Sequence, residues 1–329
     1  MKSFTYQRPF TVKEALHSIR NTPGSIFLAG GTNLVDMMKL EVINPSVLID
    51  INQLPLNKIE PLPNGGIQIG SLVRNSDLGF HPLIRKNYPV LSQAVLSGAS
   101  PQLRNMATVG GNLMQKTRCS YYRDGISPCS KRNPGSGCSA LKGYHAEHAI
   151  LGTSSSCIAT HPSDMCVALS ALEAIIHIES EEEKRKIAAS EFHLLPGNSP
   201  EKETVLEPYE IIVMIELPPL PPNTTSCYIK VSHRALYEFA LSSAAVVLEW
   251  EGEKIKQGRI ALGGVAAKPW RCFQAERLLE NSLPDEKLFR SCAETALQGA
   301  EPQKENQYKV ELTKQVICKA LSTAFKRSV

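Results

Sequence analysis

Ala107-Thr108-Val109-Gly110-Gly111-Asn112-Leu113 opens the segment that decides the fold, and His161-Pro162-Ser163-Asp164 closes it. The glycine pair runs into an expected helix, and such a turn lets backbone N–H groups approach a phosphate closely. A loop rich in Gly, Pro and Ser lies between the two ends, and it carries four cysteines: Cys119, Cys129, Cys138 and Cys157. Together these features predict a redox cluster beside a bound dinucleotide.

The spacing of the four cysteines limits the kinds of metal site. Nine, eight and eighteen residues separate successive cysteines, so no Cys-x-x-Cys pair occurs among them. This disfavours zinc ribbons and thioredoxin-like chemistry, and it also differs from the compact cysteine runs of ferredoxins. The spacing favours a metal centre over unligated thiols, but it does not choose between iron and zinc.

Basic residues around the cysteines favour iron. Four thiolates around a 4Fe–4S core leave a net negative charge, which nearby cations offset while they raise the reduction potential. A solvated basic loop would account for most of these side chains one by one. His161, next to Pro162, is expected to pack or cap rather than to bind the metal. The basic residues are Arg118, Arg123, Lys131, Arg132, His145 and His148.

A second glycine loop, Gly30-Gly31-Thr32-Asn33-Leu34, follows the short apolar run 25–29. One such loop would be weak support for a ligand, but two of the same design favour a diphosphate held between them. The chain has no Gly-x-Gly-x-x-Gly after a strand, which argues against a Rossmann nicotinamide site, and no Gly-Lys-Ser/Thr of a P-loop. FAD, bound by a fold of another type, is therefore the leading candidate.

Composition excludes several classes of protein. The chain has 329 residues, 42% apolar and 21% charged, which is typical of a globular protein of two or three domains. A net charge of +4 with dispersed Lys and Arg argues against nucleic-acid binding. The N-terminus lacks the apolar core of a secretory signal, so we expect the protein in a reducing cytoplasm, or in the periplasm if a partner with a twin-arginine signal exports it folded. Nine cysteines are then unlikely to form a disulfide framework.

The hydrophobic pattern predicts an order of elements. The N-terminal part reads as a helix opened by a Thr11–Glu14 capping box, two buried strands, a further strand and a mostly helical stretch over 76–98. The charged run 181–186 is interpreted as a turn between strands. The proline run 218–222 marks a change to antiparallel strands, expected at 226–231, 242–251 and 256–265, which are followed by helices at 271–280, 284–298 and 310–326.

With the loops and cysteines taken together, the chain resembles the FAD-binding subunit of the molybdenum hydroxylases, the xanthine dehydrogenase and carbon monoxide dehydrogenase family. The resemblance covers essentially the whole length. Segments 28–34 and 108–112 match the two pyrophosphate loops of the family, and Ser163-Asp164 matches the pair that follows them. Ile212 falls where an aliphatic residue packs near the flavin ring, and Lys230 falls at a basic residue near the isoalloxazine.

An insertion sets this chain apart from most of the family. About fifty residues with the four cysteines separate the second glycine loop from the Ser-Asp pair. The insertion is similar to one in the flavin subunits of bacterial aldehyde oxidoreductases, which holds an extra 4Fe–4S cluster. The flavin subunit of 4-hydroxybenzoyl-CoA reductase, which also carries an extra cluster, is the nearest rival.

The resemblance implies an α+β fold and a set of site residues. Two small α/β subdomains would form a non-Rossmann FAD-binding domain, followed by a C-terminal domain of three antiparallel strands plus helices. The implied domains are 1–56, 57–218 with an Fe–S insertion at about 115–160, and 219–329. The cysteines would bind the cluster, and FAD would contact Phe27, Leu28, Ala29, Gly30, Gly31, Thr32, Asn33, Leu34, Thr108, Val109, Gly110, Gly111, Asn112, Ser163, Asp164, Ile212 and Lys230.

The resemblance also implies an electron relay with partners. A molybdopterin-binding large subunit would oxidise an aldehyde to a carboxylic acid, and a 2Fe–2S small subunit would pass the electrons to this FAD and on to a ferredoxin, oxygen or another acceptor. No catalytic acid or nucleophile is expected in this chain. A xanthine dehydrogenase-like complex, a self-sufficient flavin oxidase or reductase, and a zinc-stapled assembly protein without redox function are the alternatives.

Overall fold

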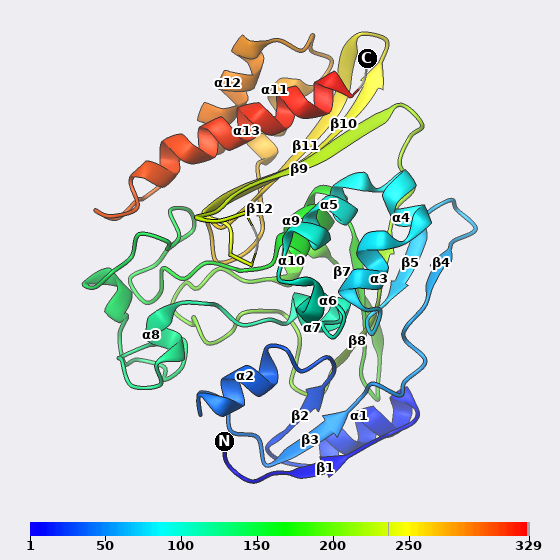
Figure 1. Ribbon diagram of the computed structural model, residues 1–329, viewed down its shortest axis with the longest axis vertical. Helices are drawn as coiled ribbons and strands as arrows, with labels where there is room; N and C mark the ends of the chain where they lie inside the picture. Colours follow the sequence, from blue (N-terminus) through cyan, green and yellow to red (C-terminus); the bar gives the residue numbers. More distant parts are fainter. Residues whose placement is uncertain (236, 328–329) are drawn as a thin grey trace.

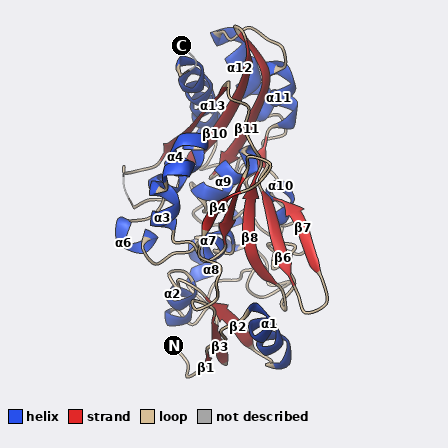
Figure 2. Ribbon diagram, turned by 90° about the vertical axis from the view of Figure 1, so that its right-hand side faces the viewer, coloured by secondary structure: helices blue, strands red, loops and turns tan. Residues whose placement is uncertain are grey.

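The computed structural model describes residues 1–235 and 237–327 and arranges them in three tiers along the longest axis (Figure 1). A three-stranded parallel sheet lies at the N-terminal end, a five-stranded antiparallel sheet in the middle, and a four-stranded antiparallel sheet at the C-terminal end. Figure 2 shows the same tiers from the side, with helices beside each sheet. The expected α+β architecture is confirmed.

The N-terminal tier follows from local sequence signals. The Thr11 hydroxyl accepts a hydrogen bond from the Glu14 N–H at 3.1 Å, and the Glu14 carboxylate accepts one from the Phe10 N–H at 2.8 Å. The capping interaction is thus formed, with Phe10 as the second donor. The first glycine loop follows the C-terminal end of strand β2. The elements are β1 (Thr5–Gln7), α1 (Val12–Asn21), β2 (Ser25–Leu28), α2 (Leu34–Lys39) and β3 (Val47–Asp50), with strand order β1-β3-β2.

The middle tier contains a sheet of order β4-β5-β8-β6-β7 and a group of short helices. Pro82 and Pro89 each begin a new helix within the stretch expected to be helical, because proline fits the first turn, where its missing N–H needs no partner. The strands are β4 (Ile59–Pro61), β5 (Ile67–Gly70), β6 (Ile175–Glu179), β7 (Lys184–Ala188) and β8 (Ile211–Leu217). The helices are α3 (Asn75–Phe80), α4 (Pro82–Asn87), α5 (Pro89–Ser97), α6 (Pro101–Arg104), α7 (Val109–Leu113), α9 (Asp164–Ala171) and α10 (Ala189–Phe192).

The interpretation of 181–186 as a turn is wrong in its second half. Strand β7 begins at Lys184 and pairs antiparallel with β6 at the edge of the sheet. Its lysines pair with acids of neighbouring strands: Lys184 Nζ lies 2.8 Å from Glu179 Oε1, and Lys186 Nζ lies 3.5 Å from Glu216 Oε2. Charged side chains suit the exposed face of an edge strand, so charge alone does not distinguish such a strand from a turn.

The C-terminal tier confirms the expected antiparallel strands and adds a two-residue strand, β12, at one edge. Helices α11 and α13 pack against this sheet, and α5 and α9 of the middle tier also contact it, so the two tiers share a packed boundary. The elements are β9 (Thr224–Val231), β10 (Ser242–Glu251), β11 (Lys254–Gly263), β12 (Trp270–Arg271), α11 (Phe273–Leu279), α12 (Glu286–Ala296) and α13 (Tyr308–Lys326).

The cysteine segment leaves the middle tier after α7 and returns at α9. It contains only helix α8 (Ser120–Arg123) and the 3-10 turn η1 (Ser139–Leu141), and it lies to one side of the molecule in Figure 1. The N–H groups of Ile150 and Leu151 both donate to the carbonyl of Val265, which ties the segment to the C-terminal tier. Within residues 1–235 and 237–327, no helix combines the length and hydrophobicity that a membrane span needs.

Candidate cofactor site

The first glycine loop presents hydrogen-bond donors that have no acceptor. After β2 the chain turns at Gly31, which has a φ of +73°, and enters α2. Among the described residues, no acceptor lies within hydrogen-bonding distance of the N–H groups of Thr32, Asn33 and Leu34. The Asn33 side chain accepts from the Lys116 N–H at 2.9 Å, whereas its buried Nδ2 has no partner within the described part of the chain. Unpaired donors at a helix N-terminus suit an anion.

The two glycine loops adjoin each other through Gly30. A Cβ added at Gly30 would lie 2.0 Å from the carbonyl oxygen of Met106 and 3.0 Å from the Cα of Ala107. Only a residue without a side chain allows this approach. The first loop therefore packs directly on the chain that enters the second loop.

The second loop uses its own N–H groups differently. Helix α7 is only five residues long, and Gly110 and Gly111 lie inside it. The first N–H groups of this helix already have acceptors within the protein. The loop can therefore offer a ligand a close approach and the Asn112 side chain, rather than free backbone N–H donors. Three hydrogen bonds take up these groups: Val109 N–H to Val73 O at 3.0 Å, Gly110 N–H to Ser71 O at 2.7 Å, and Gly111 N–H to Thr108 Oγ1 at 3.2 Å.

The Ser-Asp pair connects the second loop to the C-terminal tier. The Ser163 hydroxyl donates to Asn112 Oδ1 and also caps α9 by accepting from the Cys166 N–H at 3.1 Å. The Asp164 carboxylate accepts hydrogen bonds from the Tyr228 hydroxyl at 2.5 Å and from Lys230 Nζ at 2.8 Å. Both residues are buried, so this corner is a fixed polar joint between α9 and β9.

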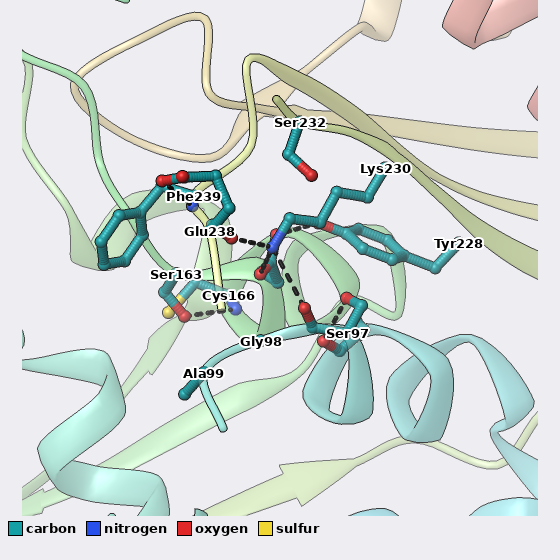
Figure 3. Close-up of polar contacts among 12 residues, drawn as sticks. Ser97, Gly98, Ala99, Ser163, Cys166, Tyr228, Lys230, Ser232, Glu238 and Phe239 are labelled. Atoms are coloured by element: carbon teal, nitrogen blue, oxygen red, sulfur yellow. Dashed lines mark hydrogen bonds and ion pairs between the residues drawn. The ribbon is translucent and has the colours of Figure 1, made fainter. Parts of the chain in front are cut away.

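Lys230 has all three of its ammonium protons occupied. Nζ donates to the carbonyls of Ser97 at 3.1 Å and Glu238 at 2.7 Å (Figure 3). It also donates to Asp164. The Lys230 and Asp164 side chains are only 9% and 6% exposed. The structure thus places Lys230 in a buried ion pair beside the Ser163-Asp164 corner. Ile212 of β8 is buried in the apolar core of the middle tier.

The four cysteines come together within the cysteine segment. None forms a disulfide, and Cys129 and Cys138 face each other in an isolated antiparallel bridge. Burial raises the pKa of the Cys119 thiol to about 12, and the nearby Cys157 and Cys129 add to the rise. Burial also raises the pKa of Cys157, with Cys138 and Cys129 adding to it and Lys131 opposing it. Cys138 thus lies opposite Cys129 in the bridge, and Cys119 packs against the small apolar cluster that contains Cys129.

A half-buried acid that sequence reasoning missed, Glu203, lies next to this segment. Glu203 Oε1 lies 3.0 Å from Lys131 Nζ, and its other oxygen contacts Lys116 Nζ. Burial alone would raise the pKa of Glu203, but Lys116 and Lys131 together hold it below its ordinary value. The acid connects the cysteine segment to the end of the second loop. Because its partners are 72 and 87 residues away, no local signal could identify it.

Replacing Glu203 by glutamine is expected to lower the free energy of unfolding by about 2 kcal/mol at pH 7, because it leaves two lysine ammonium groups without their carboxylate. Because the pKa of Glu203 is lower in the folded state, its ionised form stabilises the protein above the unfolded-state pKa of about 4.3. This stabilisation is lost as the pH falls from there through the folded-state pKa. The difference between wild type and Glu203→Gln should therefore shrink below about pH 4. Urea unfolding at several pH values checks this, with the exposed Glu201→Gln as control.

The half-buried His161 and the buried His193 line the same pocket as Glu203 and Lys131, at the end of the second loop. The rings of His161 and His193 stack edge to face with centroids 4.2 Å apart, and Cys166 lies close enough that one atom from each of the three could share a metal ion. His193 Nε2 donates to the Leu113 carbonyl at 2.9 Å, and the Ser163 N–H points to His161 Nδ1 at 3.4 Å. Burial lowers the pKa of His193 to about 4 and that of His161 well below its ordinary value. Both rings are therefore neutral, and His161 Nε2 and His193 Nδ1 have no hydrogen-bond partner among the described residues.

Comparison with known proteins agrees with this geometry. Residues 2–220 match the family model described as "FAD binding domain in molybdopterin dehydrogenase", and residues 227–324 match "CO dehydrogenase flavoprotein C-terminal domain". The chain is 47% identical to the aldehyde oxidoreductase FAD-binding subunit PaoB of Escherichia coli (strain K12), over 98% of this chain and 99% of that protein. It is 27% identical to the glyceraldehyde dehydrogenase medium chain of Sulfolobus acidocaldarius, over 96% of each.

A solved structure supports the same assignment. The fold superposes with a TM-score of 0.79 on a chain of carbon monoxide dehydrogenase from Hydrogenophaga pseudoflava, at 26% identity, covering 99% of this chain and 98% of that one. The family models together span nearly the whole sequence. This chain therefore belongs to the FAD-binding subunits of the molybdenum hydroxylase family of oxidoreductases.

Proposed function

We propose that this chain is the FAD- and 4Fe–4S-containing electron-transfer subunit of a molybdenum-dependent aldehyde oxidoreductase. The 47% identity to an aldehyde oxidoreductase FAD-binding subunit over 98% of the chain carries the aldehyde part of the proposal. Relatives of lower identity, about 27%, include a glyceraldehyde dehydrogenase and a carbon monoxide dehydrogenase medium chain. Identity therefore favours aldehyde chemistry over a xanthine dehydrogenase-like complex, since two xanthine dehydrogenase FAD-binding subunits are 24% and 23% identical.

The first glycine loop fits FAD. The unpaired Thr32, Asn33 and Leu34 N–H groups and the buried Asn33 Nδ2 would bind the diphosphate, and Asn112 would approach it from the second loop. Asp164 would accept from the hydroxyls of the sugar-like chain. When bound, the flavin exchanges electrons singly or in pairs, and the protein supplies position and charge.

The cysteine segment fits a four-thiolate iron–sulfur site. Its four thiols are free of disulfides, and Cys129 faces Cys138 in a β-bridge. The Ala159 N–H donates to Cys157 Sγ at 3.4 Å, as backbone groups do around cluster sulfurs. Lys131 and Arg132 lie next to Cys129 and offset thiolate charge. Lys131 binds Glu203, and Arg132 donates to the carbonyls of Tyr121 and Tyr122 at 2.9 and 2.7 Å. Cys119, Cys129, Cys138 and Cys157 would be the ligands.

The relay requires partners that supply and accept electrons. The site described above contains no acid, base or nucleophile placed for aldehyde oxidation. We infer that a molybdopterin large subunit performs that step and that a 2Fe–2S small subunit delivers the electrons. A ferredoxin, oxygen or another acceptor would then receive them from the flavin.

A spectrum with metal and flavin counts tests the proposal. The protein co-purified with its partners should contain about one FAD and about four iron atoms bound to this chain, and an aldehyde should bleach its flavin absorbance. Zinc in place of iron would support the zinc-stapled alternative. Turnover of an aldehyde by this chain alone would support the self-sufficient enzyme.

Replacing Lys230 by methionine is expected to lower the flavin midpoint potential, because a cation near the flavin favours its more negative reduced form. The change also leaves Asp164 buried without its cation, so the free energy of unfolding should fall by about 3 kcal/mol. Spectroelectrochemical titration and urea unfolding measure the two effects, with the exposed Lys254→Met as control. An unchanged potential would restrict Lys230 to pairing with Asp164.

A further inference from the structure

The C-terminal tier grips the cysteine segment through three residues, Glu305, Asn306 and Lys309, which we call the C-terminal clasp. Lys309 Nζ donates to the carbonyls of Glu147 at 3.0 Å, His148 at 2.9 Å and Gly264 at 2.5 Å. Asn306 Nδ2 donates to the carbonyls of His148 and Ala149, each at 3.2 Å. Asn306 and Lys309 are fully buried. The clasp therefore fixes the backbone on both sides of His148.

The clasp also orders the chain just before His148. The His145 N–H donates to Glu305 Oε2 at 2.9 Å, and the Glu305 N–H donates to His145 Nε2 at 3.2 Å. Because Nε2 accepts, the proton of the neutral ring is on Nδ1, which donates to the Ala140 carbonyl at 3.1 Å. Residues 145–149 are thus held at both ends, although Glu305 is 160 residues from His145 in sequence.

This arrangement turns the His148 ring toward Cys119. His148 Nε2 lies 3.2 Å from Cys119 Sγ. The ring is buried, and its Nδ1 has no hydrogen-bond partner among the described residues. The Cys119 sulfur is therefore the hydrogen-bond partner of the His148 ring. A neutral imidazole can donate one N–H to a thiolate.

We propose that His148 donates a hydrogen bond from Nε2 to the Cys119 sulfur of the 4Fe–4S site, and that the C-terminal clasp holds it there to raise the reduction potential of the cluster. This inference rests on the proposed function. A hydrogen bond to a cluster sulfur stabilises the reduced, more negative state, so the potential rises. His148 is thus a positioning residue that acts through Cys119, and the C-terminal tier takes part in tuning the cluster.

Reductive titration followed by electron paramagnetic resonance tests the inference on the full chain in its native complex. His148→Leu removes the donor, and we expect a lower midpoint potential of the 4Fe–4S signal with unchanged iron content. His148→Gln keeps an N–H and should give an intermediate potential. His17→Leu, which changes an exposed histidine of α1, should leave the potential as in wild type. Lys309→Met should shift it in the same direction as His148→Leu, because it loosens the clasp.

Three outcomes would overturn the inference. Equal potentials in wild type and His148→Leu at full iron content would do so and leave the proposed function intact. Loss of iron in both His148 variants would make His148 a ligand or a folding residue rather than a tuning donor. A wild-type signal that persists in Cys157→Ser would refute the cluster assignment itself, and the inference with it.

Discussion

Replacing Cys157 by serine is expected to remove nearly all of the iron bound to this chain, about four atoms per molecule, together with the broad visible absorbance of the cluster. Cys157 is buried and close to Cys138 and Cys129, so its sulfur would occupy one corner of the four-thiolate site. A serine hydroxyl is a poor ligand for iron at neutral pH, and a cluster with three thiolates is readily lost. Iron and acid-labile sulfide per FAD measure the loss.

A second cysteine provides the matched control. Cys318 lies in α13, where its Sγ faces the Phe289 carbonyl at 3.6 Å, and it is far in sequence from the cluster site. Cys318→Ser should retain full iron and flavin. The same amount of iron in Cys157→Ser and wild type would contradict the assignment, whereas one zinc atom per wild-type chain would point to a structural zinc site. Flavin content should stay close to wild type in both variants if the two cofactor sites fold independently.

The glycine loops, the cysteines and several strands could be predicted from the sequence alone. The glycine loops and the clustered cysteines can be recognised in the sequence, because each is a local pattern whose chemistry depends on residue type and spacing. Several strands can be predicted as short apolar runs bounded by turns, and β2, β9 and β10 lie close to the predicted ranges 25–29, 226–231 and 242–251.

Long-range polar contacts could not be predicted in the same way. Glu203 looks like one acid in a charged loop, and Lys309 like one lysine on an amphipathic helix. Yet Lys309 is fully buried and Glu203 half-buried, because partners from distant segments contact them. Burial of a charge depends on the assembled tertiary structure, and no single segment encodes it. The same reason explains β7, whose charged residues become a strand only because β6 offers an edge.

The second glycine loop shows a subtler limit. Its sequence matches the first loop, which suggests two equivalent sets of free N–H donors. In the folded chain, Val73 and Ser71 accept from Val109 and Gly110, so the two loops differ in what they offer. Sequence similarity could not show where each backbone hydrogen bond goes.

Replacing Gly30 by alanine is expected to weaken FAD binding by roughly a hundredfold and to destabilise the protein by about 3 kcal/mol. The added Cβ would lie 2.0 Å from the Met106 carbonyl oxygen and 2.8 Å from its carbon, and backbone atoms cannot rotate aside as a side chain can. The first loop must therefore move away from the second by more than an ångström. That movement separates the unpaired N–H groups of the first loop from Asn112, and a diphosphate held between them loses one side of its site.

Gly299→Ala separates this steric effect from the conformational cost of losing a glycine. Gly299 has a φ of +78°, and nothing lies within 4 Å of an added Cβ, so alanine there should cost only about 1 kcal/mol and leave flavin binding unchanged. Flavin affinity by fluorescence quenching, and urea unfolding with and without added FAD, distinguish the two variants. Because Gly30→Ala acts on both the loops and their ligand, added FAD should restore less stability to it than to Gly299→Ala. Equal FAD affinity in wild type and Gly30→Ala would show that the diphosphate does not depend on the contact between the two loops.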